Sequence, residues 1–142
     1  EAARSLTAQA AAQAVHISVT GTAGTVFGVR RLLYEIARNL CENAVKYNVP
    51  GGSVTVEVAE TDRDVTLLVR DTGIGIPEGD QSRVFERFYR VDKSHSRAIG
   101  GTGLGLSIVK HAVAYHHGTL RLESQPGKGT VITVTLPKEP TE

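Results

Sequence analysis

The chain has 142 residues, a length that fits one domain with its own core. Its 16 Lys and Arg residues against 15 Asp and Glu residues give a formal net charge of +1, which excludes a strong general attraction for nucleic acid. No apolar run approaches the roughly 20 residues of a membrane-spanning helix, and no signal peptide is visible. The single cysteine, Cys41, excludes an internal disulfide and favours a reducing compartment. Because methionine is absent, we expect the chain to be part of a longer protein.

The first third of the chain predicts a leading helix or linker, a strand and a long helix. Residues 1–14 are rich in alanine, which favours helix, and Val15 to Val19 alternates as a strand does. His16 could accept a phosphoryl group, but a sheet position is poorly placed for that role, and we interpret it as a surface residue. A helix is predicted from Thr25 to about Tyr47. Its apolar face, with spacings of three and four, comprises Val29, Leu33, Ile36, Leu40 and Ala44.

Beside this apolar face, the same helix carries a polar stripe of Asn39, Asn43 and Lys46. The stripe is centred roughly 100° away, because each residue turns a helix by about 100°. One interpretation is a polar edge that meets water. The other is that Asn43 offers a neutral oxygen to Mg²⁺ while Lys46 faces phosphate oxygens, since Mg²⁺ prefers few protein ligands together with substrate phosphates and water.

A predicted hairpin follows, and its second strand, which alternates from Val65 to Val69, ends in the loop Asp71 to Pro77. Two glycines in this loop free the backbone from ordinary φ limits, so that a ligand can approach the main chain. Two isoleucines add apolar surface beside the Asp71 carboxylate. The combination suits a flat heteroaromatic ring whose exocyclic amine donates a hydrogen bond to Asp71. A tight turn capped by an aspartate is the alternative.

Residues 77–101 form the least regular stretch, which we interpret as a mobile lid. Gln81 to Arg90 could form a short helix with Val84, Phe85 and Phe88 turned inward. Basic residues interleaved with aromatic ones can indicate single-stranded nucleic acid. A segment this short in a nearly neutral domain favours closure over a small anion instead.

The glycine-rich stretch Gly100 to Leu106 leads directly into a predicted helix. Free backbone N–H groups and the positive end of the helix dipole would make an anion site there, and a glycine-rich turn that caps the helix is the alternative. The stretch matches neither the Rossmann fingerprint nor the Walker A motif. Ring packing and helix capping explain His111, His116 and His117 better than metal binding does.

The chain ends with a further predicted hairpin, whose turn spans Gln125 to Gly129. The order of elements gives about five mostly antiparallel strands with three helices on one face, an α+β fold of the two-layer sandwich type that needs no parallel crossover of the Rossmann kind. We divide the chain into a leading segment at 1–14, one domain at 15–137 with its lid at about 77–101, and a solvated tail at 138–142.

Four stretches resemble, in this order, the N, G1, F and G2 boxes of the ATP-binding catalytic domain of bacterial sensor histidine kinases. They are Asn39 to Tyr47, Asp71 to Pro77, Phe85 to Arg90 and Gly101 to Leu106, and Gly127 to Thr130 resembles the last glycine motif of that family. The similarity runs from about Val15 to Leu136. It implies a Bergerat-type ATP site, which the family shares with gyrase, mismatch-repair and heat-shock chaperone ATPases.

The resemblance implies ATP and Mg²⁺ as ligands. Asp71 would read the adenine amine, Asn43 would hold Mg²⁺, and catalysis would depend on Asn43, Lys46 and Arg90, since phosphoryl transfer needs chiefly positioning and charge neutralisation. The residues that it assigns to nucleotide contact are Asn39, Asn43, Lys46, Tyr47, Asp71, Gly73, Gly75, Ile76, Tyr89, Arg90, Gly101, Thr102, Gly103, Leu104, Gly105, Leu106 and Thr130.

Two departures from related families are informative. The hydrolysing ATPases typically have a water-activating Glu four residues before the metal-binding Asn, where this chain has Asn39. A neutral amide cannot act as a general base, so we expect slow hydrolysis. No stretch resembles the histidine-bearing dimerisation hairpin of complete kinases. We therefore expect transfer of the γ-phosphoryl group to a histidine on a separate hairpin of the same protein, with a response regulator receiver domain as the later partner.

The resemblance also implies a setting: a cytoplasmic bacterial domain of a protein anchored in the inner membrane, with no contact to nucleic acid or membrane by this fragment. Two other functions remain open. One is an ATP-gated switch ATPase of the gyrase or chaperone type, and the other is a nucleotide-binding scaffold without catalysis. A related serine kinase shares the ATP fold, but the F box fits the sensor type better.

Overall fold

The computed structural model describes residues 16–21, 30–86 and 105–138, which hold five strands and three helices. The elements are β1 (His16–Gly21), α3 (Arg30–Lys46), β2 (Ser53–Glu60), β3 (Asp64–Asp71), α4 (Glu78–Gln81), α6 (Gly105–Tyr115), β4 (Thr119–Gln125) and β5 (Gly129–Pro137). The predictions for the leading segment at 1–14, for most of the lid and for nearly all of the tail lie outside the described residues.

The strands form a single sheet in the order β1-β2-β3-β5-β4. The pairs β2–β3, β3–β5 and β4–β5 are antiparallel, which confirms the mostly antiparallel sheet. β1 and β2 are parallel, however, with His16 opposite Ser53. The expectation that no parallel crossover is needed was therefore wrong for this pair. Parallel neighbours need a long connection, usually helical, and α3 lies in the connection between β1 and β2.

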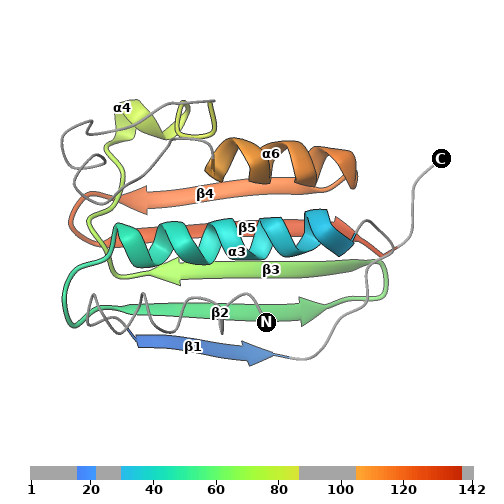
Figure 1. The fold of residues 1–142 in the computed structure, drawn as a ribbon, viewed down its shortest axis with the longest axis horizontal. Coiled ribbons are helices and arrows are strands. Elements are labelled where there is room, and N and C mark those ends of the chain that lie inside the picture. Colours follow the sequence, from blue (N-terminus) through green and yellow to red (C-terminus); the bar gives the residue numbers. More distant parts are fainter. Residues whose placement is uncertain (1–15, 22–29, 87–104, 139–142) are drawn as a thin grey trace.

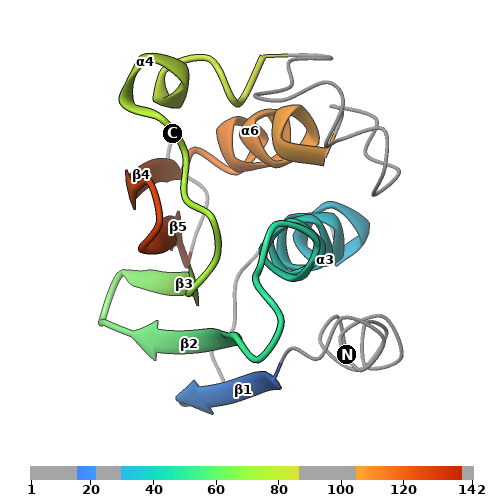
Figure 2. The same ribbon diagram turned by 90° about the vertical axis from the view of Figure 1, so that its left-hand side faces the viewer.

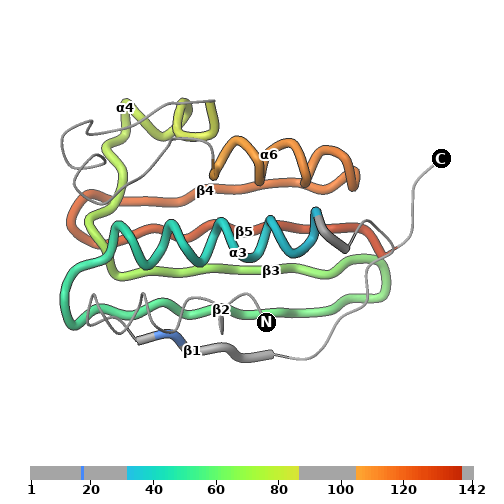
Figure 3. Tube along the Cα trace, viewed as in Figure 1, coloured from blue at the N-terminus to red at the C-terminus, as the bar shows by residue number. Residues whose placement is uncertain are grey.

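The two longer helices cover one face of the sheet (Figure 1). Figure 2 shows α3 and α6 together on the same side of the strands, and the Cα trace of Figure 3 shows α3 running along β3. α3 contacts α6, β2 and β3, whereas α6 and α4 contact β4. The fold is thus the predicted two-layer sandwich. Among the helices of the described ranges, none combines the length and the apolar character that crossing a membrane requires.

The core lies between this helix layer and the sheet. On α3, the predicted apolar face is correct where it can be followed, since Ile36, Leu40 and Ala44 are buried and Leu33 packs against them half-buried. The sheet contributes alternate residues of its helix-facing side: Val54, Val56, Val69, Ile132, Val134 and Leu136. Burying each aliphatic side chain of this size stabilises the fold by about 1.5–3 kcal/mol. Cys41 belongs to the same core, and burial raises the pKa of its thiol to about 11.

The short helix after the Asp71 loop begins earlier than predicted. α4 spans Glu78–Gln81, and turns rather than helix follow it up to residue 86, so the prediction of a helix over Gln81 to Arg90 was wrong in its start. Pro77 explains the shift, because its φ of −55° is preset for entry into a helix and its carbonyl accepts a hydrogen bond from the Asp80 N–H at 2.9 Å. Val84 is buried, as predicted.

α6 ends in a cap built by its histidines. The Gly118 N–H donates to the Val113 carbonyl at 2.9 Å and the His117 N–H donates to the Ala114 carbonyl at 3.0 Å, which is the Schellman arrangement. His117 takes the left-handed position of this cap, with φ of 59°. His116 is buried, and its Nδ1 lies 2.8 Å from the Ala112 carbonyl oxygen. Packing and capping therefore account for these two histidines.

This cap allows a test of local stability. Replacing His117 by glycine should raise the free energy of unfolding by about 0.5–1 kcal/mol, because glycine avoids the cost of an L side chain in the left-handed region but loses more chain entropy on folding. Urea denaturation measures the change. The control is His111→Gly at an exposed position inside α6, which should lower stability. A loss of stability in His117→Gly would contradict the role of the cap.

Candidate functional site

The side chain of Asp71 lies at the end of β3 on the helix-facing side of the sheet. Its Oδ1 accepts hydrogen bonds from the Gly73 N–H at 2.9 Å and from the Thr130 N–H at 3.2 Å. Burial raises the pKa of this carboxyl to about 6, against which the two backbone hydrogen bonds act. Within the described residues no donor reaches Oδ2. One oxygen is thus fixed by the fold and the other remains available to a ligand.

The loop after Asp71 is held between the end of α3 and the β4–β5 turn. The Ile74 N–H donates to the Tyr47 carbonyl at 3.1 Å, and the Ile74 carbonyl accepts from the Gly127 N–H at 2.8 Å. At Gly73 a Cβ atom would collide with the Tyr47 carbonyl oxygen. Gly75, with φ of 74°, lies equally close to the backbone of the turn. The two glycines are therefore required by close packing on both sides of the loop.

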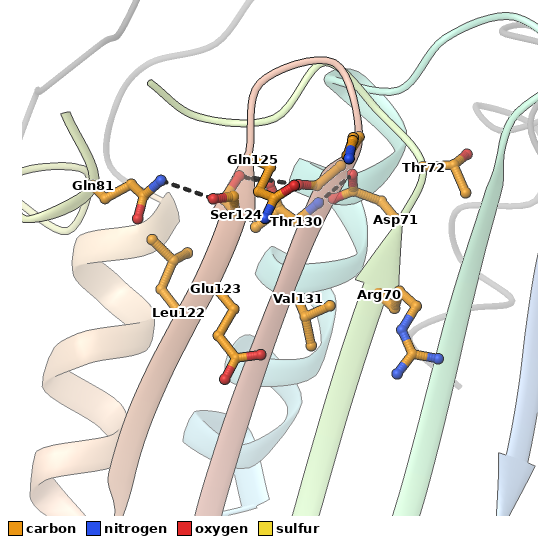
Figure 4. Close-up of a pocket in the computed structure, with 12 residues that line it drawn as sticks. Arg70, Asp71, Thr72, Gln81, Leu122, Glu123, Ser124, Gln125, Thr130 and Val131 are labelled. Atoms are coloured by element: carbon orange, nitrogen blue, oxygen red, sulfur yellow. Dashed lines mark hydrogen bonds between the residues drawn. The ribbon is translucent and has the colours of Figure 1, made fainter. Parts of the chain in front are cut away.

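A line of polar groups continues from Asp71 across the strands β3, β5 and β4 (Figure 4). Thr130 stands opposite Asp71 in the sheet register, and Ser124 stands opposite Thr130. The Ser124 and Thr130 hydroxyl oxygens are 2.8 Å apart. The Ile76 N–H donates to Ser124 Oγ at 2.8 Å. This line of hydrogen bonds thus connects Asp71, where the loop begins, to Ile76 near its other end.

The polar stripe lies on α3, and the residue that follows this helix contacts the loop. Lys46 pairs through its Nζ with Glu42 Oε1 at 2.8 Å, and the second oxygen of Glu42 pairs with Arg38 at 2.9 Å. Asn43 is half-buried, and its side-chain amide makes no hydrogen bond within the described part of the chain. Tyr47 follows directly and contacts the loop through its carbonyl. The end of α3, directly after Lys46, therefore meets the Asp71 loop.

Asn39 lies one turn further back on α3. Its Nδ2 donates to the Glu35 carbonyl at 2.8 Å and to Glu35 Oε2 at 3.0 Å. Its Oδ1 lies against Gly105, the first residue of α6, where a Cβ atom would be 3.1 Å away. Leu106 is half-buried against the core. Asn39 thus contacts the N-terminus of α6, the end at which an anion site is predicted.

A hollow of about 610 Å³ opens at the same end of the sheet and includes Asp71 and Thr130. Its other walls lie along the β4–β5 turn and on the sheet face away from α3, where Arg70, Val131 and Glu123 are register neighbours (Figure 4). Asn43 and Lys46 do not line it. The structure therefore brings Asp71, the loop glycines and Thr130 together, and joins the α3 stripe to them only through the contacts of the loop.

Most of the F box and most of the G2 box of the predicted site fall outside the described ranges. Tyr89, Arg90, Gly101, Thr102, Gly103 and Leu104 lie outside the described residues. In the described ranges, no three His, Cys, Asp or Glu side chains gather as a metal site would require. A magnesium ion would depend on Asn43 and on oxygens that a ligand brings, and this arrangement suits Mg²⁺.

The sequence profile of one family, described as "Histidine kinase-, DNA gyrase B-, and HSP90-like ATPase", matches residues 28–140. The chain belongs to this family. The sensor-like histidine kinase SenX3 of Mycolicibacterium smegmatis is 47% identical over 133 residues, which cover 92% of this chain and 35% of SenX3. The sensor histidine kinase WalK of Bacillus subtilis is 49% identical over 105 residues, 72% of this chain and 17% of WalK.

Solved structures agree with this assignment. A structure titled "Mycobacterial sensor histidine kinase MprB" superposes with a TM-score of 0.82 at 36% identity, covering 99% of this chain and 95% of that one. The resemblance to the ATP-binding catalytic domain of sensor histidine kinases is therefore confirmed. The chain spans about a third of the length of SenX3.

Three residues around the site were not found from the sequence. Asn48 braces the loop from the end of α3, since its Nδ2 donates to the Ser53 carbonyl at 2.9 Å and its Oδ1 accepts from Thr72 Oγ1 at 3.2 Å. Ser124 and Gln81 brace it from the other side. Each of the three has a partner distant in sequence: Thr72 for Asn48, Ile76 for Ser124, and Ser124 for Gln81. In the sequence, only the preference of asparagine for turns could have pointed to one of them, Asn48.

The raised pKa of Asp71 predicts a pH dependence of stability. The folded carboxyl releases its proton near pH 6 and an ordinary one near 3.8, so the folded state binds more protons between these values. Relative to Asp71→Asn, which does not titrate, the free energy of unfolding of the parent should fall by on the order of 2 kcal/mol as the pH rises from about 4 to about 6. Urea denaturation across this range tests the sign, and parallel profiles for the two proteins would contradict the raised pKa.

The close packing of the loop predicts a contrast between two glycines. Gly73→Ala should lower the free energy of unfolding by about 1–3 kcal/mol, because the new methyl group has no room beside the Tyr47 carbonyl. Gly79→Ala, whose methyl group would meet open space in α4, is the matched control and should be neutral or slightly stabilising. Equal stability of the two variants would contradict the packed loop.

Proposed function

We propose that the chain binds ATP with Mg²⁺ and positions the γ-phosphoryl group for transfer to a histidine on a dimerisation hairpin of the same protein. The observation that carries this proposal is the Asp71 carboxylate, whose Oδ1 is held by two backbone N–H groups while Oδ2 meets no donor among the described residues. A half-buried acceptor beside a loop that carries two isoleucines suits a flat ring with an exocyclic amine, such as adenine.

The phosphate end is assigned to the stripe of α3 and to the start of α6. Lys46 would exchange its pairing with Glu42 for phosphate oxygens, at a cost below about 1 kcal/mol because this pair is partly exposed. Asn43 would hold the Mg²⁺, which neutralises phosphate charge when bound. The first N–H groups of α6, beginning at Gly105, would face the phosphates.

Slow hydrolysis follows from Asn39. Its amide is neutral and donates to Glu35, so it cannot remove a proton from water. Glu42, the carboxylate next to Asn43, would keep its ion pair with Arg38, and one residue along the helix turns its side chain about 100° away from that of Asn43. The bound nucleotide would therefore persist until an acceptor histidine arrives.

The comparisons support this proposal without extending to the whole protein. A structure titled "Crystal structure of ShkA full-length in complex with AMPPNP" superposes with a TM-score of 0.83 at 26% identity, and this chain covers 29% of it. The remaining two thirds of proteins such as SenX3 lie beyond the match. The acceptor hairpin, a response regulator receiver domain as partner, and a cytoplasmic position beneath an inner-membrane anchor are accordingly part of the proposal.

The first test is calorimetric titration with a non-hydrolysable ATP analogue, with and without Mg²⁺. The parent should bind more tightly with Mg²⁺, Asp71→Ala should lose at least about tenfold in affinity, and Asn43→Ala should lose the Mg²⁺ dependence. Asp62→Ala, at an exposed turn at the far end of β3, is the matched control. A folded parent that fails to bind would overturn the proposal.

Turnover separates the proposed kinase domain from the two other functions. Efficient hydrolysis without a partner would instead support an ATP-gated switch. Full-length protein that binds ATP but never becomes labelled would support a scaffold. Stable radiolabel on a histidine of the isolated chain would show that no separate hairpin is needed.

A further inference from the structure

The Ser124 hydroxyl group makes all three of the hydrogen bonds that a hydroxyl can make. Its Oγ lies 3.0 Å from the Gly129 carbonyl, 2.8 Å from the Ile76 N–H and 2.8 Å from Thr130 Oγ1. A hydroxyl has one proton to donate and two lone pairs to accept with. A carbonyl oxygen can only accept, so the Ser124 hydroxyl donates its proton in the hydrogen bond to the Gly129 carbonyl. An N–H can only donate, so one lone pair of Ser124 Oγ accepts the hydrogen bond from the Ile76 N–H.

This balance fixes the direction of the hydrogen bond between Ser124 and Thr130. Because the Ser124 proton is already placed, the proton in the short contact must come from Thr130. Thr130 Oγ1 then has only lone pairs left. Thr130 is almost fully buried and lines the hollow beside Asp71, so a group that reaches its Oγ1 from the hollow meets an acceptor.

Gln81 keeps Ser124 and Ile76 in place. Its Nε2 donates to the Ile76 carbonyl at 3.0 Å and to the Ser124 carbonyl at 3.0 Å. Ile76 is therefore held at both its N–H and its carbonyl. Ser124 is likewise held through its backbone, so its hydroxyl cannot turn away without breaking this set of bonds.

We propose that Ser124 is a specificity-determining positioning residue, which makes Thr130 an obligate acceptor and so makes the site selective for a purine with a 6-amino group. The proposal rests on the proposed function, in which Asp71 binds the base. A 6-amino group brings two N–H donors to these acceptors. A 6-oxo purine brings an oxygen acceptor instead, which would face lone pairs only.

The test compares affinities for ADP and inosine diphosphate by calorimetry. In Ser124→Ala the Thr130 proton is released and can turn toward a 6-oxo group, so the preference for ADP should fall by about tenfold, the worth of one hydrogen bond. Ser124→Thr retains the hydroxyl and should keep the preference. Ser82→Ala, an exposed serine directly after α4, is the matched control.

Thr130→Val gives an independent measurement should Ser124→Ala fold poorly. It removes the hydroxyl itself and should lower the preference to the same extent. Because both changes act through one hydroxyl, the double variant should lose no more than Thr130→Val alone. An unchanged preference in either folded single variant would overturn the proposal.

Hydrogen exchange of the nucleotide-free protein separates this proposal from the proposed function. Ser124→Ala should speed exchange of the Ile76 amide at least about tenfold, whether or not a nucleotide binds. An unchanged rate would contradict the hydrogen bonding from which the proposal starts. Failure of the parent to bind ADP, with Ile76 exchange behaving as expected, would instead overturn the proposed function.

Discussion

The site depends on one carboxylate oxygen shared between two backbone N–H groups. Oδ1 of Asp71 joins the start of its own loop, through Gly73, to the neighbouring strand, through Thr130. Burial makes this charge costly, which is why the pKa of the carboxyl rises to about 6 despite both hydrogen bonds. The fold thus maintains a charge that destabilises it, and a ligand that donates to Oδ2 would relieve part of that cost. Such strain is typical of a binding site rather than of a structural turn.

Much of this arrangement could be predicted from the sequence. Periodicity identified the strands and the core face of α3, and paired glycines after an apolar strand identified the Asp71 loop. Thr130 came only from the resemblance, because a threonine in a strand carries no signal of its own. Residues such as Ser124 and Gln81 were missed because their partners lie 48 and 43 positions away, and only the packing of the loop and α4 against β4 brings them together.

The errors in the prediction also have physical causes. The parallel pairing of β1 and β2 could not be seen in either strand, because it follows from the length of the helical connection between them. The helix after the loop was placed too late, because apolar spacing at Val84 and Phe85 was given more weight than the fixed φ of Pro77. Local backbone chemistry outweighed periodicity in a segment too short for a clear period.

In the proposed nucleotide site, recognition of the base and recognition of the phosphates would not be independent. Lys46 is the last residue of α3, and the carbonyl of the next residue, Tyr47, accepts the hydrogen bond from Ile74 in the loop. Gly73 packs against the same carbonyl with no space for a methyl group. A shift of α3 would therefore move the loop that carries Asp71, and a shift of the loop would move the end of α3. Close packing between chain segments far apart in sequence would hold the two ends of the proposed nucleotide site at a fixed separation.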